Sequence, residues 1–295
     1  MKPLISICIP TYNQTFYLKK VIDSILIQTF SNYEIIISDD STTNDVRELI
    51  EQYKLLNPTI IIDYYHNSPG LGTPANWNNS ISKSKGKWIK IMHHDDRFAH
   101  PESLQQFINL TNKNDNIEFV YSGSYYINSQ KNKVNHSISL ATYKRININP
   151  KSLFSGNLIG PPSAVMFKNT EILFDEKLKW LVDIEFYTRY IGNRKSTNYT
   201  ADLLIESFIP DERVTNDCWM NKYVEIPEYL YCINKQKIKS LKIQLHTANL
   251  FYKLRVYSLS DIRECGYKYP VPITLLGLIF IIRLKNKIKN TINRL

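Results

Sequence analysis

The sequence predicts an α/β fold, with a mostly parallel sheet and helices on both of its faces. Short apolar runs alternate with segments of helical hydrophobic spacing through the first 125 residues. Repetition of strand and helix in this way builds parallel sheets whose crossovers cover both faces. Apolar side chains make up 43% of the 295 residues, enough for a sizeable core.

The elements follow in order along the chain. Strands are expected at residues 4–9, 33–40, 60–65, 88–92 and 117–123. Helices are expected after the first strand, from Thr43 or Asn44, from Thr73 with Pro74 in the first turn, and from Pro101. Beyond residue 125 we expect a polar loop at 128–137 and a stiff Gly/Pro turn at 160–163 before a strand. A loop entering a helix is expected within 174–190, and a later helix at 250–257.

Polar residues follow three of these strands. Residues 10–13 follow the first strand, Asp39 and Asp40 end the second, and residues 93–96 follow the fourth. Open sheets of this type bind ligands beyond the carboxyl ends of their strands. The sequence therefore predicts one site where these three clusters meet.

The cluster after the fourth strand has the composition of a metal site. If the strand continues, His93 and Asp95 share a face and Asp96 lies just past the end. Carboxylates suit Mg²⁺ or Mn²⁺ bound to substrate phosphates, and the imidazole favours Mn²⁺. In the alternative, Asp95 or Asp96 caps the helix at Pro101 or pairs with Arg97. The second aspartate pair at this edge favours the metal–diphosphate site.

Asp39 and Asp40 also have two interpretations. A carboxylate can accept hydrogen bonds from a nucleobase or a ribose, and Tyr12 can stack on the base. The tract "SDDSTTND" is also rich in turn and cap formers, so the pair can equally form a turn before the next helix. Tyr12 can likewise be ordinary packing.

Four motifs together resemble the family 2 glycosyltransferases, over residues 3–233. They are "ICIPTYNQ", "VIDSILIQTFSNYEIIISDDST", "KGKWIKIMHHDD" and "LVDIEFYTRY". The resemblance implies the Rossmann-like GT-A fold and an inverting transfer of a sugar. It places the nucleotide-binding residues at Pro10, Tyr12, Asp39, Asp40 and Asn76, the metal site at His93, Asp95 and Asp96, and the general base at Asp183, followed by Arg189.

The chain departs from the family pattern at three positions. His93 stands where the first aspartate of the metal motif is usual. Ala75 stands where an arginine is frequent, so a diphosphate contact is either missing or supplied by Lys83, Lys85 or Lys87. Asn234 stands where many members have a histidine.

The resemblance selects Asp183 as the base that takes the proton of the acceptor hydroxyl. Asp175 and Glu185 are rival bases, and Asp183 can instead be a helix N-cap or the partner of Lys179. Trp180 can stack on an acceptor sugar or belong to the core. The turn at 160–163 is expected to line the acceptor side.

We expect a glycosyltransferase domain at 1–235, divided into a nucleotide-binding half at 1–125 and an acceptor half at 126–235. A helical extension at 236–295 ends in an amphipathic basic tail, and no acidic residue follows Glu264. That tail suits either an anionic membrane surface or packing on the domain. No apolar run is long enough to span a bilayer, and the first residues do not read as a signal peptide. A cytoplasmic protein, peripheral on the inner face of the plasma membrane, is expected.

The net charge of +10 favours a polyanionic or phosphorylated partner. The partners expected are a nucleotide-sugar donor, UDP-linked first, and a saccharide or lipid-linked saccharide acceptor, in bacterial O-antigen or capsule synthesis. No nucleic-acid motif is present. The alternatives are a catalytically degenerate nucleotide-binding relative and a sugar nucleotidyltransferase. The latter should carry a Gly-rich loop after the first strand, whereas "PGLGTP" follows the third.

Overall fold

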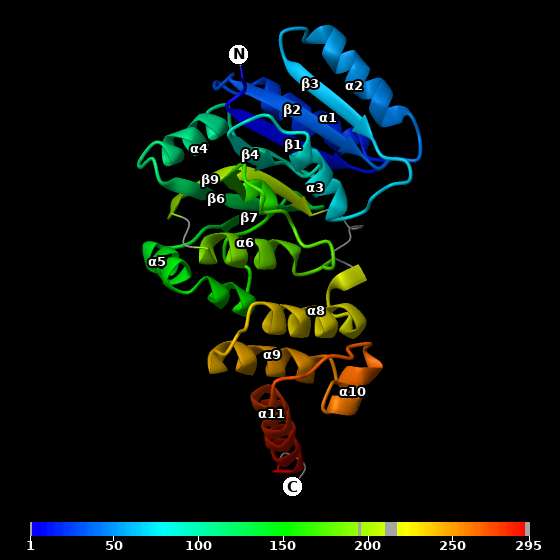
Figure 1. Ribbon diagram of the computed structural model, residues 1–295, viewed down its shortest axis with the longest axis vertical. Helices are drawn as coiled ribbons and strands as arrows, with labels where there is room; N and C mark the ends of the chain where they lie inside the picture. Colours follow the sequence, from blue (N-terminus) through cyan, green and yellow to red (C-terminus); the bar gives the residue numbers. More distant parts are fainter. Residues whose placement is uncertain (1, 194–195, 210–216, 293–295) are drawn as a thin grey trace.

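The computed structural model describes residues 2–193, 196–209 and 217–292, and in these a single curled sheet forms the centre (Figure 1). The strand order is β3-β2-β1-β4-β8-β6-β9-β5, and β7 pairs with β6. The strands are β1 (Ile5–Thr11), β2 (Tyr33–Asp39), β3 (Ile61–His66), β4 (Trp88–Ile91), β5 (Asp96–Phe98), β6 (Ile117–Asn128), β7 (Lys133–His136), β8 (Val165–Lys168) and β9 (Ser196–Ile209).

The first four strands are parallel, as the sequence predicts. β1 pairs with both β2 and β4, and β2 pairs with β3. Every residue of β1 and β2 is buried, the pattern of strands covered on both faces. The second half of the sheet is mixed: β8 runs antiparallel to β4 and β6, β9 runs parallel to β6, and β5 runs antiparallel to β9.

Helices cover both faces of the sheet. The helices are α1 (Thr15–Leu26), α2 (Asp45–Leu56), α3 (Ala75–Ser82), α4 (Ser103–Thr111), α5 (Leu140–Ile148), α6 (Val182–Gly192), α8 (Lys222–Lys235), α9 (Leu241–Lys253), α10 (Leu259–Glu264) and α11 (Ile273–Ile292), with short 3₁₀ turns η1 (Pro150–Ser155) and η2 (Pro162–Ala164). One apolar cluster contains side chains of α1, α2 and α4, and the other contains those of α3, α6 and α8. Alternate residues of β1 enter the two clusters, with Ile7 on one side and Cys8 on the other.

The C-terminal helices continue the second of these clusters. Buried side chains connect Phe186 of α6 through Ile233 of α8 and Phe251 of α9 to Leu275 and Ile279 of α11. Figure 1 places α11 at the end of the molecule opposite α2. Within the described ranges, no helix has both the length and the apolar character needed to cross a membrane.

Two local expectations are wrong. Thr73 does not cap the third helix: α3 begins at Ala75, and Pro74 occupies the cap position. The stretch 128–137 is not simply a loop, because β6 extends to Asn128 and a turn leads into β7. β7 is largely exposed and polar, so it lacks the hydrophobic alternation by which a strand is recognised in sequence.

The turn before β4 gives a test of the packing. A Cβ on Gly86 would lie 2.6 Å from the backbone nitrogen of Ser6 and 2.7 Å from the carbonyl carbon of Ile5. We predict that Gly86→Ala lowers the free energy of unfolding by about 1–3 kcal/mol, since the backbone of β1 must move. Gly277→Ala is the control, because nothing lies within 4 Å of a Cβ there. Urea denaturation should show no loss for the control; equal stability of the two variants would contradict the packing.

Candidate active site

A turn, not a continued strand, assembles the metal-site residues. β4 ends at Ile91, and the backbone N–H of Asp96 donates to the carbonyl of His93 (3.0 Å) before β5 begins. The expectation that His93 and Asp95 share a strand face is therefore wrong. The turn still brings ligand atoms of His93, Asp95 and Asp96 within 4.8 Å of one another.

In the described part of the chain, neither aspartate is the cap residue of the following helix, and Arg97 forms an ion pair with a glutamate. The helix that follows begins at Ser103, and its cap residue is Glu102. Arg97 pairs with Glu206, with 2.6 Å between Nε and Oε2. Asp96 instead begins β5 and pairs with Ser207 of β9.

The three side chains fit a divalent cation. Among the described residues, His93 Nε2 and Asp96 Oδ1 are buried atoms without a hydrogen-bond partner. Buried polar atoms are nearly always satisfied, so two orphans beside a carboxylate indicate a missing ligand. An imidazole nitrogen with carboxylate oxygens suits Mn²⁺ or Mg²⁺.

Burial controls the charge of this cluster. It lowers the pKa of His93 to about 3, and the charges of His94 and Lys90 contribute. The ring of His93 also packs on Trp77, with 4.5 Å between centroids. The imidazole is therefore neutral and able to bind a metal. Burial raises the pKa of Asp96, against hydrogen bonds from Ser163 and Ser207 and the charge of Lys90, which lower it.

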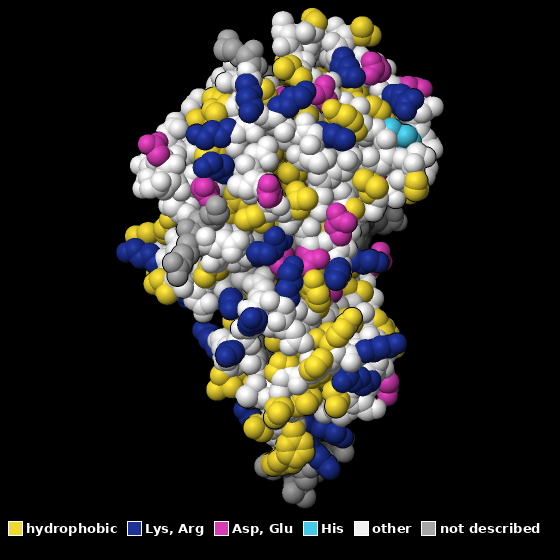
Figure 2. Space-filling view, viewed as in Figure 1, with side chains coloured by type: hydrophobic (Ala, Val, Ile, Leu, Met, Phe, Trp, Pro, Cys, Tyr) yellow, Lys and Arg dark blue, Asp and Glu magenta, His cyan; other side chains and the backbone are white. Residues whose placement is uncertain are grey.

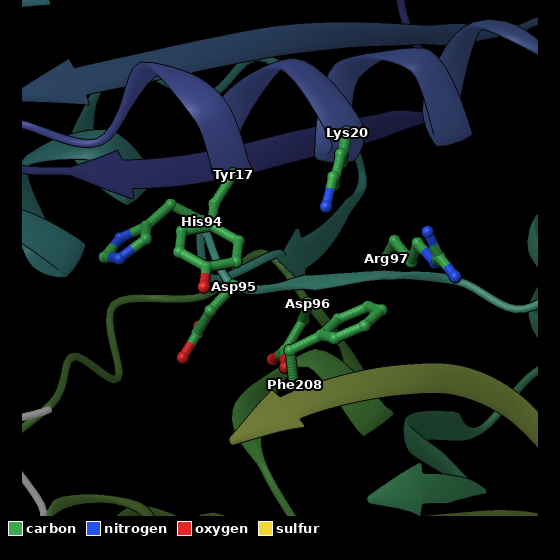
Figure 3. A pocket seen from close by; sticks show the side chains of 7 residues that line it. All are labelled: Tyr17, Lys20, His94, Asp95, Asp96, Arg97 and Phe208. Atoms are coloured by element: carbon green, nitrogen blue, oxygen red, sulfur yellow. The ribbon is translucent and has the colours of Figure 1, made fainter. Parts of the chain in front are cut away.

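A small pocket lies beside the metal-site turn (Figure 3). Tyr17 and Lys20 project into it from α1, and Phe208 of β9 lies across from them. Lys20 has no carboxylate within ion-pair distance in the described part of the chain, and its Nζ lies 3.9 Å from the Phe16 ring. Sequence reasoning did not select Tyr17 or Lys20, because α1 gives them only helical spacing and no motif.

Pro10 and Asp39 belong to the strands that end at this edge. Pro10 is buried in β1, and its backbone accepts a hydrogen bond from His94. Asp39 is fully buried at the end of β2, and its carboxylate accepts from the N–H of Ser41 (2.9 Å) and the hydroxyl of Tyr64 (2.7 Å). Tyr12, in contrast, is 55% exposed.

Asp40 anchors the loop between β3 and α3. Its carboxylate accepts from Asn67 Nδ2 (2.8 Å), from Leu71 N (3.0 Å) and from Gly72 N (2.8 Å). Asn76 follows that loop, is buried, and donates to the carbonyl of Thr11 (3.4 Å). The structure thus brings the predicted nucleotide residues to one edge, with both aspartates engaged in turn and loop contacts.

The expected lysine contact to a diphosphate is wrong for Lys85 and Lys87. Both precede β4 and therefore lie at the amino ends of the parallel strands, opposite the site. Lys85 Nζ is 3.1 Å from Asp63, and its backbone N–H donates to buried Glu34 (2.6 Å). Lys83 ends α3, with its Nζ over the ring of Tyr65.

Asp183 lies in the first turn of α6, past the cap residue Leu181. Its Oδ2 accepts from Asn157 Nδ2 (2.6 Å), and its Oδ1 accepts from the N–H of Ile184 (2.8 Å). Burial raises the pKa of Asp183 to about 6, although these hydrogen bonds lower it. Among the described residues no cation pairs with it, so neither the N-cap nor the Lys179 alternative holds.

The rival bases are held in ion pairs. Lys235 Nζ lies 2.5 Å from Asp175 and 2.8 Å from Glu185, while Arg189 Nη2 lies 3.0 Å from Glu185. Burial acts to raise the pKa of Asp175, but the hydrogen bonds from Lys235 and Tyr231 lower it overall. Asp183 is therefore better suited than either rival to accept a proton near neutral pH.

The two predicted acceptor-side residues lie at opposite ends of α6, Trp180 just before it and Arg189 in its last turn. Trp180 is partly buried, and its backbone N–H donates to Glu228 (2.9 Å), which also accepts from the N–H groups of Lys179 and Leu181. Arg189 is committed to Glu185 and to the carbonyl of Leu173 (2.6 Å). Glu228 thus fixes the amino end of α6, a role that only the fold reveals.

Tyr187 of α6 is affected by the charges of two of the predicted site residues. Burial raises its pKa well above the usual range, and the charges of Asp183, Tyr126 and Asp96 raise it further. Its hydroxyl donates to the carbonyl of Gly160 (3.2 Å). The candidate base and one candidate metal ligand therefore both act electrostatically on one buried phenol.

Comparison with known sequences identifies the family. The sequence profile of Glycosyl transferase family 2 matches residues 6–172, more than half of the chain. The chain belongs to glycosyl transferase family 2. An uncharacterized glycosyltransferase of Methanocaldococcus jannaschii is 31% identical over 88% of this chain and 87% of that protein. The putative colanic acid biosynthesis glycosyl transferase WcaA of Escherichia coli is 31% identical over 64% of this chain and 66% of its own.

Solved structures share the fold. TarS of S. aureus, in complex with UDP-GlcNAc, superimposes with a TM-score of 0.63 at 15% identity, covering 91% of this chain and 76% of TarS. The mannosyltransferase PcManGT of Pyrobaculum calidifontis, in complex with GDP-Man and Mn²⁺, gives a TM-score of 0.57 at 12% identity over 95% and 68% of the two chains. These likenesses establish the GT-A fold, and the family makes the chain a glycosyltransferase with relatives in polysaccharide biosynthesis.

The His93–Asp95–Asp96 cluster gives a direct test. We predict that Mn²⁺ and UDP, each present at about one hundred times its dissociation constant, raise the melting temperature of the protein by about 5 °C. The reason is that only the folded chain binds these ligands. Asp95→Asn should abolish the metal-dependent part of this shift. Asp202→Asn, an exposed carboxylate elsewhere, is the control and should keep it. Equal shifts in both variants would place the cation at another site.

Proposed function

We propose that this glycosyltransferase moves a sugar, with inversion, from a nucleoside diphosphate donor to a saccharide acceptor. The donor is a UDP-sugar in the first instance, and the acceptor is lipid-linked, within synthesis of a surface polysaccharide such as O-antigen or capsule. The observation that carries the proposal is the presence of the His93–Asp95–Asp96 cluster together with Asp183, a carboxylate of raised pKa, with Asp96 and Asp183 both acting electrostatically on Tyr187.

Each predicted residue then has a part in the reaction. Pro10, Tyr12 and Asn76, with the turn and loop fixed by Asp39 and Asp40, bind the nucleoside. His93, Asp95 and Asp96 hold a divalent cation, which when bound neutralises negative charge on the departing diphosphate.

Asp183 receives the proton of the acceptor hydroxyl as that oxygen attacks the anomeric carbon. Asn157 donates a hydrogen bond to Oδ2 of Asp183 and thereby orients the carboxylate. Oδ2 keeps a second lone pair, which can accept this proton. Trp180, beside the start of α6, contacts the acceptor sugar. Arg189 supports this side of the site through its bonds to Glu185 and Leu173.

The same features weigh against the alternatives. A degenerate relative has no need of a carboxylate of raised pKa together with buried ligand atoms that lack a partner among the described residues. A sugar nucleotidyltransferase requires a glycine-rich loop after the first strand, and residues 12–14 contain no glycine. The loop with Gly70 and Gly72 follows β3 and is bound by Asp40.

We further propose that α11 lies on the inner face of an anionic plasma membrane. Ile273, Phe280, Ile281, Leu284 and Ile288 are exposed apolar side chains of this helix, between 48% and 86% accessible. Figure 2 shows apolar side chains with basic ones beside them at this end of the molecule. A helix of this kind suits the interface of an anionic bilayer, where a lipid-linked acceptor would be presented.

Turnover should depend on pH through Asp183. Since only the ionised carboxylate accepts a proton, the release of nucleoside diphosphate from a nucleotide sugar should fall roughly tenfold per pH unit below about 6. Asp183→Asn should lower the rate by about 10²–10⁴-fold, while Asp202→Asn should leave it unchanged. A variant Asp183→Asn that keeps the wild-type rate would remove this residue from the role of base.

Membrane contact should depend on the exposed face of α11. The double variant Phe280→Ser, Ile281→Ser should bind phosphatidylglycerol vesicles roughly tenfold more weakly, or weaker still. The reason is that two apolar side chains that would be buried in the membrane interface are then absent. Leu55→Ser with Leu56→Ser is the matched control, since both leucines are exposed on α2. Co-sedimentation measures the effect, and an equal loss in the control pair, or no binding by the wild-type chain, would refute the contact.

A further inference from the structure

We propose that Lys90 is a positioning residue that anchors the turn at residues 160–163 and thereby sets the spacing between the metal cluster and Asp183. The inference rests on the proposed function, because it concerns the same site. It gives a structural role to a buried lysine and to a turn. The contacts of both are not used in the reaction described above.

Lys90 is a fully buried lysine in β4, and burial lowers the pKa of its amine well below the usual range, although the charge of Asp96 raises it. Its Nζ donates to the backbone carbonyls of Ser163 and of Val165 (3.3 Å) and lies 4.3 Å from the centroid of the Phe107 ring. In the described chain, no carboxylate lies within 4 Å of it. Burying an amine is costly when no carboxylate is in direct contact with it, and an apolar side chain would fill the same space. Packing alone therefore does not account for a lysine here.

Ser163 connects Lys90 to the His93–Asp95–Asp96 cluster. Its carbonyl is bound by Lys90, while its hydroxyl accepts from the N–H of His93 (3.0 Å) and hydrogen-bonds to Asp96. The residue is fully buried, so no water competes for these bonds. One side chain thus contacts two of the three proposed metal ligands, and such supporting contacts orient ligands.

The other end of the turn contacts the base. The carbonyl of Gly160 accepts from Asn157 Nδ2 (2.9 Å) and from Tyr187, and the same Asn157 nitrogen donates to Asp183. Asn157 Oδ1 in return accepts from the N–H of Gly160 (3.0 Å). Gly160 adopts a φ of +107°, which favours glycine.

The turn between these two ends is short and stiff. Pro161 and Pro162 each have a fixed φ, so the backbone between Gly160 and Ser163 has little freedom. A displacement at Ser163 is therefore transmitted to Gly160, and from there to Asn157 and Asp183. Lys90 binds the backbone carbonyl of Ser163 and is itself neither a proposed metal ligand nor the proposed base.

The test is a double-mutant cycle on cation binding. Lys90→Met, Ser163→Ala and the double variant are compared by the affinity for Mn²⁺ in the presence of UDP, measured by electron paramagnetic resonance. Each single change should weaken Mn²⁺ binding about tenfold. The double variant should bind no more weakly than the weaker single variant, because Lys90 is proposed to act only by positioning the hydroxyl that Ser163→Ala removes. Lys168→Met is the control, since Lys168 of β8 pairs with Glu118 instead.

Amide hydrogen exchange without any ligand is the second measurement. Lys90→Met should speed exchange at His93 and at residues 157–163 together and leave the strands β1 to β3 unchanged. A double variant whose loss equals the product of the two single losses would overturn the proposal. So would unchanged Mn²⁺ affinity in Lys90→Met, whatever its melting temperature. If the wild-type chain binds no Mn²⁺ with any nucleoside diphosphate, the proposed function fails, and exchange alone then decides the role of Lys90.

Discussion

The parallel pairing of β1 with β2 and with β4 is the constraint on which the site depends. Because the three strands share a direction, their carboxyl ends meet at one edge, where Thr11 is in register with Asp39 and the N–H of Met92 donates to Cys8 (2.9 Å). The metal-site turn, the nucleotide residues and the loop anchored by Asp40 are all consequences of this arrangement. The lysines that precede β4 are excluded from the site by the same rule.

A reversed strand completes the site. β8 runs antiparallel to β4, so its amino end lies beside the carboxyl end of β4, and the turn that precedes β8 therefore reaches the metal cluster. The same turn contacts Asn157 and Tyr187, and through them Asp183 on α6. Ion pairs of Asp175 and Glu185 with Lys235 lie apart from this contact. Of the three carboxylates considered as bases, Asp183 is thus the one that has no cationic partner among the residues the structure describes.

Sequence alone predicts the parallel half of this fold, because apolar runs and helical spacing are local features of the chain. It also predicts which polar residues gather at the carboxyl edge of the parallel strands, because those residues directly follow the strands. It places His93, Asp95 and Asp96 together correctly but for the wrong reason, since a turn and not strand alternation unites them. It does not find Asn157, Ser163 or Lys90, because their roles depend on contacts between residues 26 to 75 positions apart. β7 is missed because an exposed strand carries no hydrophobic pattern.

The central claim is that one edge of the sheet binds a cation together with a nucleoside diphosphate. The most direct measurement is the anomalous scattering of Mn²⁺ in crystals grown with UDP. The account predicts a peak about 2.0–2.3 Å from a carboxylate oxygen of Asp95, within reach of His93 Nε2 and Asp96 Oδ1, and in contact with the diphosphate. A peak bound by other residues, or diphosphate density without a peak at this turn, would contradict it.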